Sequence, residues 1–157
     1  MKKISSFQID HTRLLEGLYV SRTDVFGKET FTTFDLRFVR PNSDDILSTK
    51  AVHAIEHLAA SYFRNHETLS DKTVYFGPMG CRTGFYLIVH GKLSSLDILS
   101  YVEDMLKFII DFEGVIPGQS EKECGNYKDM SLREAKTASK KYLALLMENN
   151  DKRFEYA

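Results

Sequence analysis

The segment 49–65 places the strongest constraint on how this chain can fold, because its apolar residues follow a helical repeat. On a wheel of about 100° per residue, they gather on one side of the helix. The residues on that side are Ala51, Ile55, Leu58, Ala59 and Tyr62. Ser48 or Thr49 can cap a helix that begins at this point. The segment therefore predicts an amphipathic helix whose apolar side packs against another layer of the protein.

Two histidines lie off the apolar side of this predicted helix. His53 and His57 are four residues apart, so both imidazole rings can reach one metal ion. Glu56 precedes His57 and can act as a general base beside such an ion. A histidine of the core would lie on the apolar side, which disfavours that interpretation. A solvated polar face remains the alternative on this segment alone.

A clear strand pattern covers residues 31–39. One side of the strand carries Phe34, Leu36 and Phe38, and the other carries Thr33, Asp35 and Arg37. This alternation predicts a strand with one buried face. Pro41 and Asn42 then end it.

Further along the chain, strand and helix patterns are mixed. Residues 73–76 and 83–90 are β-branched and aromatic, which predicts two strands around a tight turn or loop. Capping arrangements of Ser94 with Asp97 and of Ser131 with Glu134 predict helices over 95–112 and 132–148, with a loop over 115–130. The hairpin-like pair favours antiparallel pairing. Together these elements predict a two-layer α+β fold, with a mainly antiparallel sheet packed against helices.

Composition excludes several classes of protein. The 157 residues suit one domain over 1–157, and a net charge of -1 without basic blocks argues against nucleic-acid binding. No run approaches the roughly 18 apolar residues that cross a membrane. Asp10 and His11 interrupt any signal peptide. We therefore expect a cytoplasmic protein whose two cysteines serve as thiols, ligands or reactive groups.

The loop that contains Cys124 offers a third ligand to a two-histidine site. A thiolate together with two imidazoles suits zinc or iron(II). Glu121 and Glu123 are rival ligands in the same loop. An ordinary loop thiol is the remaining alternative, although a loop rich in charge is an unusual place for a packing cysteine.

Cys81 lies in a loop with glycines on both sides, between Gly77 and Gly84. These glycines let a ligand approach the backbone closely. Arg82 and a nearby metal ion would lower the pKa of the thiol, and the resulting thiolate can accept and return protons. A small buried hydrophobic residue in a turn is the alternative.

Several short motifs occur here in an order and at spacings that are specific in combination. They are Ser6-Phe-Gln-Ile-Asp-His11, Phe34-Asp-Leu-Arg37-Phe, Pro41-Asn42, His53-Ala-Ile-Glu56-His57, Gly77-Pro-Met-Gly-Cys81-Arg-Thr-Gly-Phe-Tyr86 and Glu123-Cys124-Gly125. In these motifs the chain resembles the S-ribosylhomocysteine lyase (LuxS) family from end to end. The resemblance implies a LuxS/metallopeptidase-like α+β fold and one catalytic domain.

The resemblance also implies a site and an assembly. The metal would be iron(II), one per subunit, with zinc or cobalt able to substitute, held by His53, His57 and Cys124. Cys81 would shuttle protons, and Glu56 would be a second acid and base. The family is a homodimer with two interface sites, so the partner chain would complete the site that holds Cys81. The residues expected to bind substrate are Ser6, Phe7, His11 and Arg37, which the partner chain would supply, and Arg64 near the amino-acid end of the substrate.

The implied reaction splits the thioether of S-ribosylhomocysteine into homocysteine and 4,5-dihydroxy-2,3-pentanedione, the precursor of the quorum-sensing signal autoinducer-2. It would serve autoinducer synthesis or methionine and homocysteine recycling. Tyr75 and Gly77 depart from the usual aspartate and serine of the family. Two alternatives remain: a metallopeptidase with Glu121 or Glu123 as third ligand, and a non-catalytic metal- or ligand-binding protein.

Overall fold

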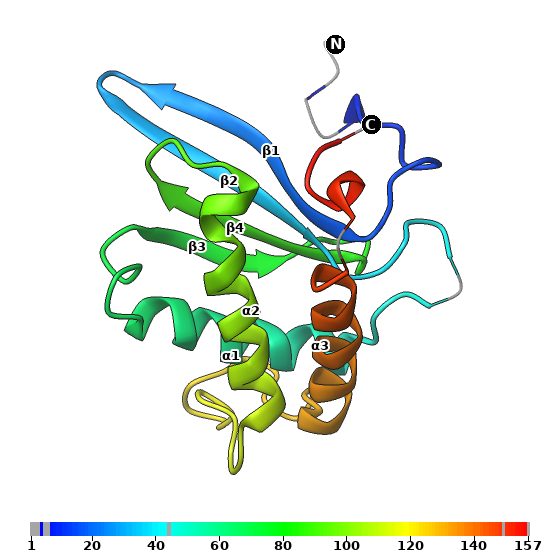
Figure 1. Ribbon diagram of the computed structural model, residues 1–157. Helices are drawn as coiled ribbons and strands as arrows, with labels where there is room; N and C mark the ends of the chain where they lie inside the picture. The colour runs from blue at the N-terminus through cyan, green and yellow to red at the C-terminus, as the bar shows by residue number, and fades with distance from the viewer. Residues whose placement is uncertain (1–3, 5–6, 44, 149, 157) are drawn as a thin grey trace.

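A computed structural model describes residues 4, 7–43, 45–148 and 150–156. Four antiparallel strands form a sheet in the order β1-β2-β4-β3. Their bounds are Gly17–Phe26 for β1, Glu29–Arg37 for β2, Thr73–Pro78 for β3 and Gly84–His90 for β4. Three helices cover one face of this sheet, as Figure 1 shows. The predicted two-layer α+β fold is confirmed.

The three helices begin at residues that cap them. Helix α1 spans Thr49–Asn65, and the Ser48 side chain accepts a hydrogen bond from the Ala51 amide. Helix α2 spans Ser95–Asp111 with both arms of the Ser94–Asp97 capping box present. Helix α3 spans Leu132–Leu146, close to the predicted range, and is followed by the short 3-10 helix η2, Asp151–Arg153.

The capping box predicted at the start of α3 forms only in part. Ser131 accepts from the Glu134 amide as expected. The Glu134 carboxylate instead accepts a hydrogen bond from Ser48 Oγ, the cap of α1. The start of α3 is therefore tied to the start of α1, the helix that carries the two histidines.

The core lies between the sheet and the helices. Phe34, Leu36, Phe85 and Leu87 of the central strands are fully buried there. They pack with apolar residues of all three helices, including Ile55, Leu58, Phe63, Ile98, Val102, Met105 and Tyr142. The apolar side of the predicted helix over 49–65 therefore faces the core, as expected.

The prediction that β2 buries only one face is wrong. Thr33, Asp35 and Arg37, on the opposite face, are also buried. A segment from the far end of the chain covers this face, because Tyr156 donates a hydrogen bond to Asp35 Oδ2 over 2.8 Å. The described part of the N-terminal segment (dark blue) and the C-terminal segment (red) lie on this side of the sheet in Figure 1. Alternation of residue type cannot reveal a cover that comes from 121 positions away.

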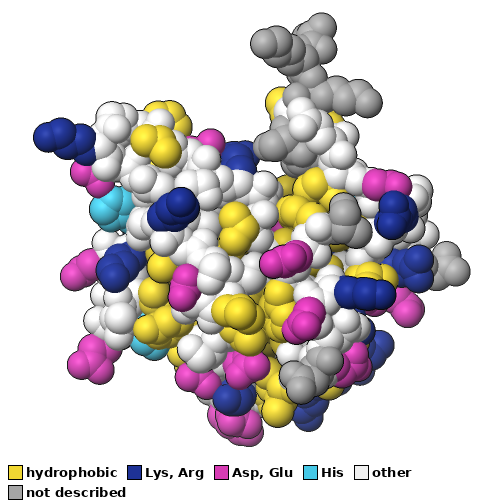
Figure 2. All heavy atoms as spheres, turned by 45° about the horizontal axis from the view of Figure 1, so that its top comes forward, with side chains coloured by type: hydrophobic (Ala, Val, Ile, Leu, Met, Phe, Trp, Pro, Cys, Tyr) yellow, Lys and Arg dark blue, Asp and Glu magenta, His cyan; other side chains and the backbone are white. Residues whose placement is uncertain are grey.

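The surface carries charges of both signs. Basic and acidic side chains are interspersed over the face that Figure 2 presents. None of the helices in the described ranges has the length and hydropathy needed to cross a membrane.

Candidate active site

Three residues from two segments form a cluster that can hold a metal ion. Ligand atoms of His53, His57 and Cys124 all lie within 4.8 Å of one another. Cys124 Sγ is 3.4 Å from His53 Nε2. Helix α1 supplies both histidines one turn apart, and the loop between α2 and α3 supplies the thiol. Within the described part of the chain, neither Glu121 nor Glu123 belongs to the cluster, so Cys124 is the third candidate ligand.

Backbone carbonyls of the same loop orient both imidazole rings. His57 Nδ1 is 2.8 Å from the Pro117 carbonyl, and His53 Nδ1 is 3.1 Å from the Asp129 carbonyl. With Nδ1 of each ring engaged, Nε2 is the nitrogen left to bind a metal, which is the usual outer-shell arrangement for a histidine ligand. Gly118 has φ of +74°, and a Cβ atom there would lie 3.0 Å from His57 Nδ1. Glycine therefore permits this close approach.

The donor set fits zinc or iron(II). Metal–nitrogen bonds of about 2.0–2.1 Å and metal–sulfur bonds of about 2.3 Å require ligand atoms only a few ångströms apart. The 3.4 Å between Cys124 Sγ and His53 Nε2 meets this requirement. Two imidazoles and one thiolate leave a fourth position for water or substrate, which is typical of catalytic metal sites.

Cys81 lines a separate cavity of about 570 Å³. The wall of this cavity comes from the N-terminal segment, the end of β2, the loop after β2 and the β3–β4 turn. Its lining residues are Phe7, His11, Arg37, Pro41, Asn42, Ile46, Pro78, Met79, Gly80, Cys81, Thr83 and Tyr86. The predicted residues Phe7, His11, Arg37 and Cys81 are therefore brought together, within one chain.

The surroundings of Cys81 favour its thiolate. Burial raises the pKa of the thiol, but hydrogen bonds from Thr83 and the positive charge of Arg37 outweigh burial, so the pKa lies below its ordinary value. Cys81 Sγ is 3.1 Å from Thr83 Oγ1 and 4.0 Å from Arg37 Nη1. A depressed pKa suits a group that accepts and returns protons near neutral pH.

The arginine beside Cys81 is Arg37, not the predicted Arg82. Arg82 adopts a left-handed conformation with φ of 59° in the β3–β4 turn. Its guanidinium donates instead to the Leu47 carbonyl, over 3.4 Å. Sequence adjacency suggested Arg82, whereas the pairing of β2 with β4 brings Arg37 opposite Gly84 and next to the turn.

Arg37 forms a buried ion pair with Asp35. Arg37 Nη2 donates to Asp35 Oδ2 over 2.6 Å, and the two side chains are 3% and 1% exposed. Arg37 Nη1 donates to Thr83 Oγ1 over 2.5 Å. One guanidinium therefore joins the carboxylate to the groups around Cys81. Neither Thr83 nor Asp35 was predicted to belong to the site.

The other predicted residues fall in several places. Glu56 is half-buried on α1 and directly precedes His57 in the sequence. Arg64, also on α1, donates to the Val74 carbonyl at the sheet edge over 2.8 Å. His11 Nδ1 is 2.9 Å from the Ile9 carbonyl. Ser6 lies outside the described residues.

The position of Tyr75 depends on Gly77. A Cβ atom at residue 77 would lie 1.8 Å from the Tyr75 hydroxyl oxygen. The phenol ring therefore extends along β3 toward Gly77, in the direction of the turn that carries Cys81. The two departures noted in the sequence thus form one structural unit.

The division of the site differs from the expected one. We expected the partner chain to supply Phe7, His11 and Arg37 to a site that held Cys81 and the metal. Instead, these residues share a cavity with Cys81 of the same chain. His53, His57 and Cys124 do not line that cavity.

Comparison with known proteins shows similarity along nearly the whole chain. The sequence model of S-ribosylhomocysteinase (LuxS) matches residues 4–153. An S-ribosylhomocysteine lyase of Clostridium beijerinckii is 57% identical over 91% of this chain and 90% of its own. One of Clostridium acetobutylicum is 51% identical over 99% of both chains. One of Finegoldia magna is 52% identical over 98% of this chain and 96% of its own.

Proposed function

Because the chain belongs to the S-ribosylhomocysteinase (LuxS) family, we propose that it cleaves the thioether of S-ribosylhomocysteine. The products are homocysteine and 4,5-dihydroxy-2,3-pentanedione, the precursor of autoinducer-2, so the enzyme is a carbon–sulfur lyase of autoinducer synthesis. Residues 1–157 act as one catalytic domain. The observation that carries this proposal is a two-histidine, one-cysteine cluster in a chain that also holds a thiol with a depressed pKa.

The chemistry requires proton transfers before the carbon–sulfur bond can break. A thioether sulfur is a poor leaving group until a carbonyl stands two carbons away. The carbonyl of the ribose chain must therefore migrate from the first to the third carbon, and each migration removes a proton and returns it one carbon over. The Cys81 thiolate takes and returns these protons, and Glu56 handles protons in enolisation and elimination. Elimination then releases homocysteine without an added oxidant or water.

We propose iron(II) as the resident metal, one ion per subunit, with zinc or cobalt able to substitute. His53, His57 and Cys124 would hold it. When bound, the ion supplies a Lewis acid that polarises oxygen atoms of the substrate. A cytoplasmic location suits this site, because Cys81 and Cys124 are both free thiols.

The amino-acid end of the substrate would be held near the edge of the sheet. Arg64 lies seven residues after His57, on the same side of α1 and about 10 Å farther along the helix axis. Its guanidinium can bind a carboxylate there. Arg64→Ala should raise the apparent substrate constant more than it lowers the maximal rate.

A homodimer accounts for the separation of the two functional clusters. The residues that line the Cys81 cavity do not include any of the three residues of the metal cluster. Phe7 of the cavity is 70% exposed, and Cys81 is exposed as well. In a two-fold dimer, the Cys81 cavity of one chain can face the metal cluster of the other, and symmetry then produces two composite sites. Ser6, Phe7, His11 and Arg37 would bind substrate from the side that carries Cys81.

Complementation between inactive subunits tests this assembly. Cys81→Ala mixed with Glu56→Gln gives heterodimers in which one site has both changes and the other has neither. With complete random exchange, half of the dimers are mixed, so activity should recover to roughly a quarter of wild type. Cys81→Ala mixed with Arg37→Ala is the control and should stay inactive, because both changes affect the same side of each site. Recovery in the control pair alone would mean that Cys81 and Arg37 belong to different halves of each site. Recovery in neither pair would place the whole site in one chain, provided that mass spectrometry verifies the heterodimers.

The reaction itself is tested by incubating the metal-loaded protein with S-ribosylhomocysteine and a thiol reagent. A lyase releases free homocysteine. A metallopeptidase or a non-catalytic binding protein would release none, and that result would reject the proposed function.

A further inference from the structure

The C-terminal segment reaches the buried ion pair behind Cys81. Tyr156 Oη donates to Asp35 Oδ2 over 2.8 Å, and Arg37 Nη2 donates to the same oxygen over 2.6 Å. The Tyr156 ring stacks on Tyr19 of β1, with ring centroids 4.6 Å apart and planes 15° apart. A chain of direct contacts therefore runs from Tyr156 through Asp35 and Arg37 to the side chains around Cys81.

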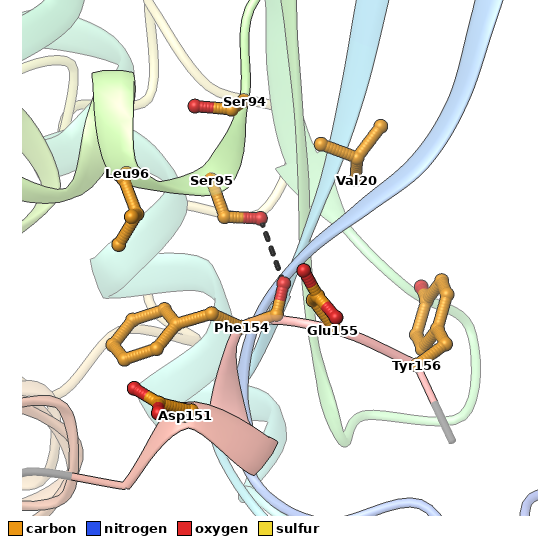
Figure 3. Close-up of a pocket in the computed structure, with 8 residues that line it drawn as sticks. All are labelled: Val20, Ser94, Ser95, Leu96, Asp151, Phe154, Glu155 and Tyr156. Atoms are coloured by element: carbon orange, nitrogen blue, oxygen red, sulfur yellow. Dashed lines mark hydrogen bonds between the residues drawn. The ribbon is translucent and has the colours of Figure 1, made fainter.

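The segment that carries Tyr156 is anchored on both sides. Ser95 Oγ, at the start of α2, donates to the Phe154 carbonyl over 3.1 Å. In Figure 3, Phe154 and Tyr156 lie on opposite sides of the segment, with Phe154 toward Leu96 of α2. The packing of Phe154 and the stacking of the Tyr156 ring on Tyr19 together fix the position of the Tyr156 hydroxyl.

The ion pair has an unusual hydrogen-bonding pattern. Arginine and a carboxylate frequently form two parallel hydrogen bonds, because the fork of the guanidinium matches the two oxygens. Here Asp35 Oδ1 and Arg37 Nε are both buried and have no hydrogen-bond partner among the described residues. The pair is joined at a single point, although the atoms for a second hydrogen bond are present. Buried polar groups without partners are costly, so a neighbouring contact must hold this arrangement.

We propose that Tyr156 is a positioning residue, whose hydroxyl holds Asp35 in this single-point contact and thereby keeps the other arm of Arg37 on Thr83 and Cys81. Without the hydroxyl, the carboxylate is free to rotate and bind the guanidinium through both oxygens. That rotation draws Nη1 away from Thr83 Oγ1, now at 2.5 Å, and from Cys81 Sγ, now at 4.0 Å. The thiolate then loses part of the positive charge that stabilises it.

The test measures alkylation of Cys81 by iodoacetamide as a function of pH. Mass spectrometry of the tryptic peptides separates Cys81 from Cys124. Besides Arg37, the ionisable side chains that line the cavity with Cys81 among the described residues are His11 and Tyr86. Arg82 follows Cys81 in the turn, Arg40 and Asp45 lie on the loop after β2, and Asp35 pairs with Arg37. All of these groups are unchanged in every variant. Alkylation needs no substrate turnover, so its outcome is independent of the lyase assay, although the catalytic meaning of the result rests on the proposed role of Cys81.

Tyr156→Phe keeps the ring and removes only the hydroxyl. We expect the pH profile of Cys81 alkylation to shift to higher pH in this variant. At pH 7, where most of the thiol is protonated, the alkylation rate should be about threefold to tenfold lower than in wild type. Tyr19→Phe is the matched control. It removes a hydroxyl from the same stack, one that donates to the Leu15 carbonyl rather than to Asp35, and its profile should match wild type.

Three outcomes would overturn the proposal. They are an unchanged profile in Tyr156→Phe, an equal shift in both variants, and a shift of Tyr156→Phe to lower pH. A truncated variant that ends at Glu155 also lacks the Tyr156 hydroxyl and so tests the proposal independently of any folding defect specific to Tyr156→Phe. It should shift the profile in the same direction, and thermal unfolding of all four proteins shows whether each is folded during the assay.

Discussion

The metal cluster and the Cys81 cavity obtain their geometry in different ways. Two of the three candidate ligands lie one helical turn apart, and a single loop supplies the third candidate ligand and both orienting carbonyls. The Cys81 cavity needs the N-terminal segment, the strands β2 and β4 and their adjoining loops at the same time, and the C-terminal segment reaches Asp35 behind it. Local spacing can specify a metal site, whereas the reactivity of a thiol depends here on residues that only the finished fold brings together.

The largest effect should come from the residue that joins the metal loop to α1. Cys124→Ala removes a direct ligand, and changes to outer-shell partners alone cost about 10–100-fold in metal affinity or activity. We expect metal content to fall to background and activity with it. Glu121→Ala and Glu123→Ala should keep the metal, as shown by elemental analysis of anaerobically purified protein. Metal loss in a glutamate variant but not in Cys124→Ala would favour the peptidase-like ligand set.

On the cavity side, the largest effect should be on stability. Arg37→Met leaves the Asp35 carboxylate buried without its cation, which should lower the free energy of unfolding by about 3–5 kcal/mol. Urea unfolding measures this change. The double variant Asp35→Leu/Arg37→Met should recover much of the lost stability, because an apolar pair can replace a buried ion pair. Cys81 reactivity should not recover, and a double variant that restores both would contradict a role for Arg37 at the thiol.

Much of the fold could be predicted from local patterns. The range 49–65 and its capping residue matched α1 because the apolar repeat and the serine lie within the helix and its first turn. Strand β1 was missed, since its residues 21–24 are polar and its pairing with β2 shifts register between Val20 and Arg22. The burial of Asp35 and the roles of Thr83 and Tyr156 could not be predicted, because each depends on contacts between distant segments.

A moderate effect is expected from the hydrogen-bond donor nearest the thiol. Thr83→Val keeps the shape of the side chain and removes the hydroxyl that lies 3.1 Å from Cys81 Sγ. Because the side-chain hydrogen bond from Thr83 helps hold the pKa of Cys81 below its ordinary value, its loss raises the pKa, while the backbone hydrogen bond from residue 83 is kept. The pH profile of alkylation should therefore move to higher pH. Thr83→Ser retains a hydroxyl and should stay near wild type. A profile unaffected by Thr83→Val would assign the reactivity to Arg37 and the backbone amide of residue 83.

The smallest effect should come from Gly77. Gly77→Ala places a methyl group against the exposed, movable ring of Tyr75, so we expect a loss of at most about 1 kcal/mol in unfolding free energy. In a Tyr75→Ala background the same substitution meets no ring and should stabilise by about 0.4–1 kcal/mol, through the entropy of the unfolded chain. Urea unfolding of wild type, the two single variants and the double variant gives the coupling free energy between residues 75 and 77. An equal effect in both backgrounds would mean that Tyr75 does not occupy the space beside Gly77.

The segment between α2 and α3 also determines how a bound metal ion could leave. It consists of turns, and it meets the two histidines of α1 through the Pro117 carbonyl, Cys124 Sγ and the Asp129 carbonyl. Release of an ion bound at this cluster would require Cys124 to move away, and with it the backbone that holds both rings. Metal exchange, amide hydrogen exchange and protease cleavage in this segment should therefore share one local opening step. The time for which a metal ion stays bound would then depend on how often this segment opens, and not only on the affinity of the three side chains for the ion.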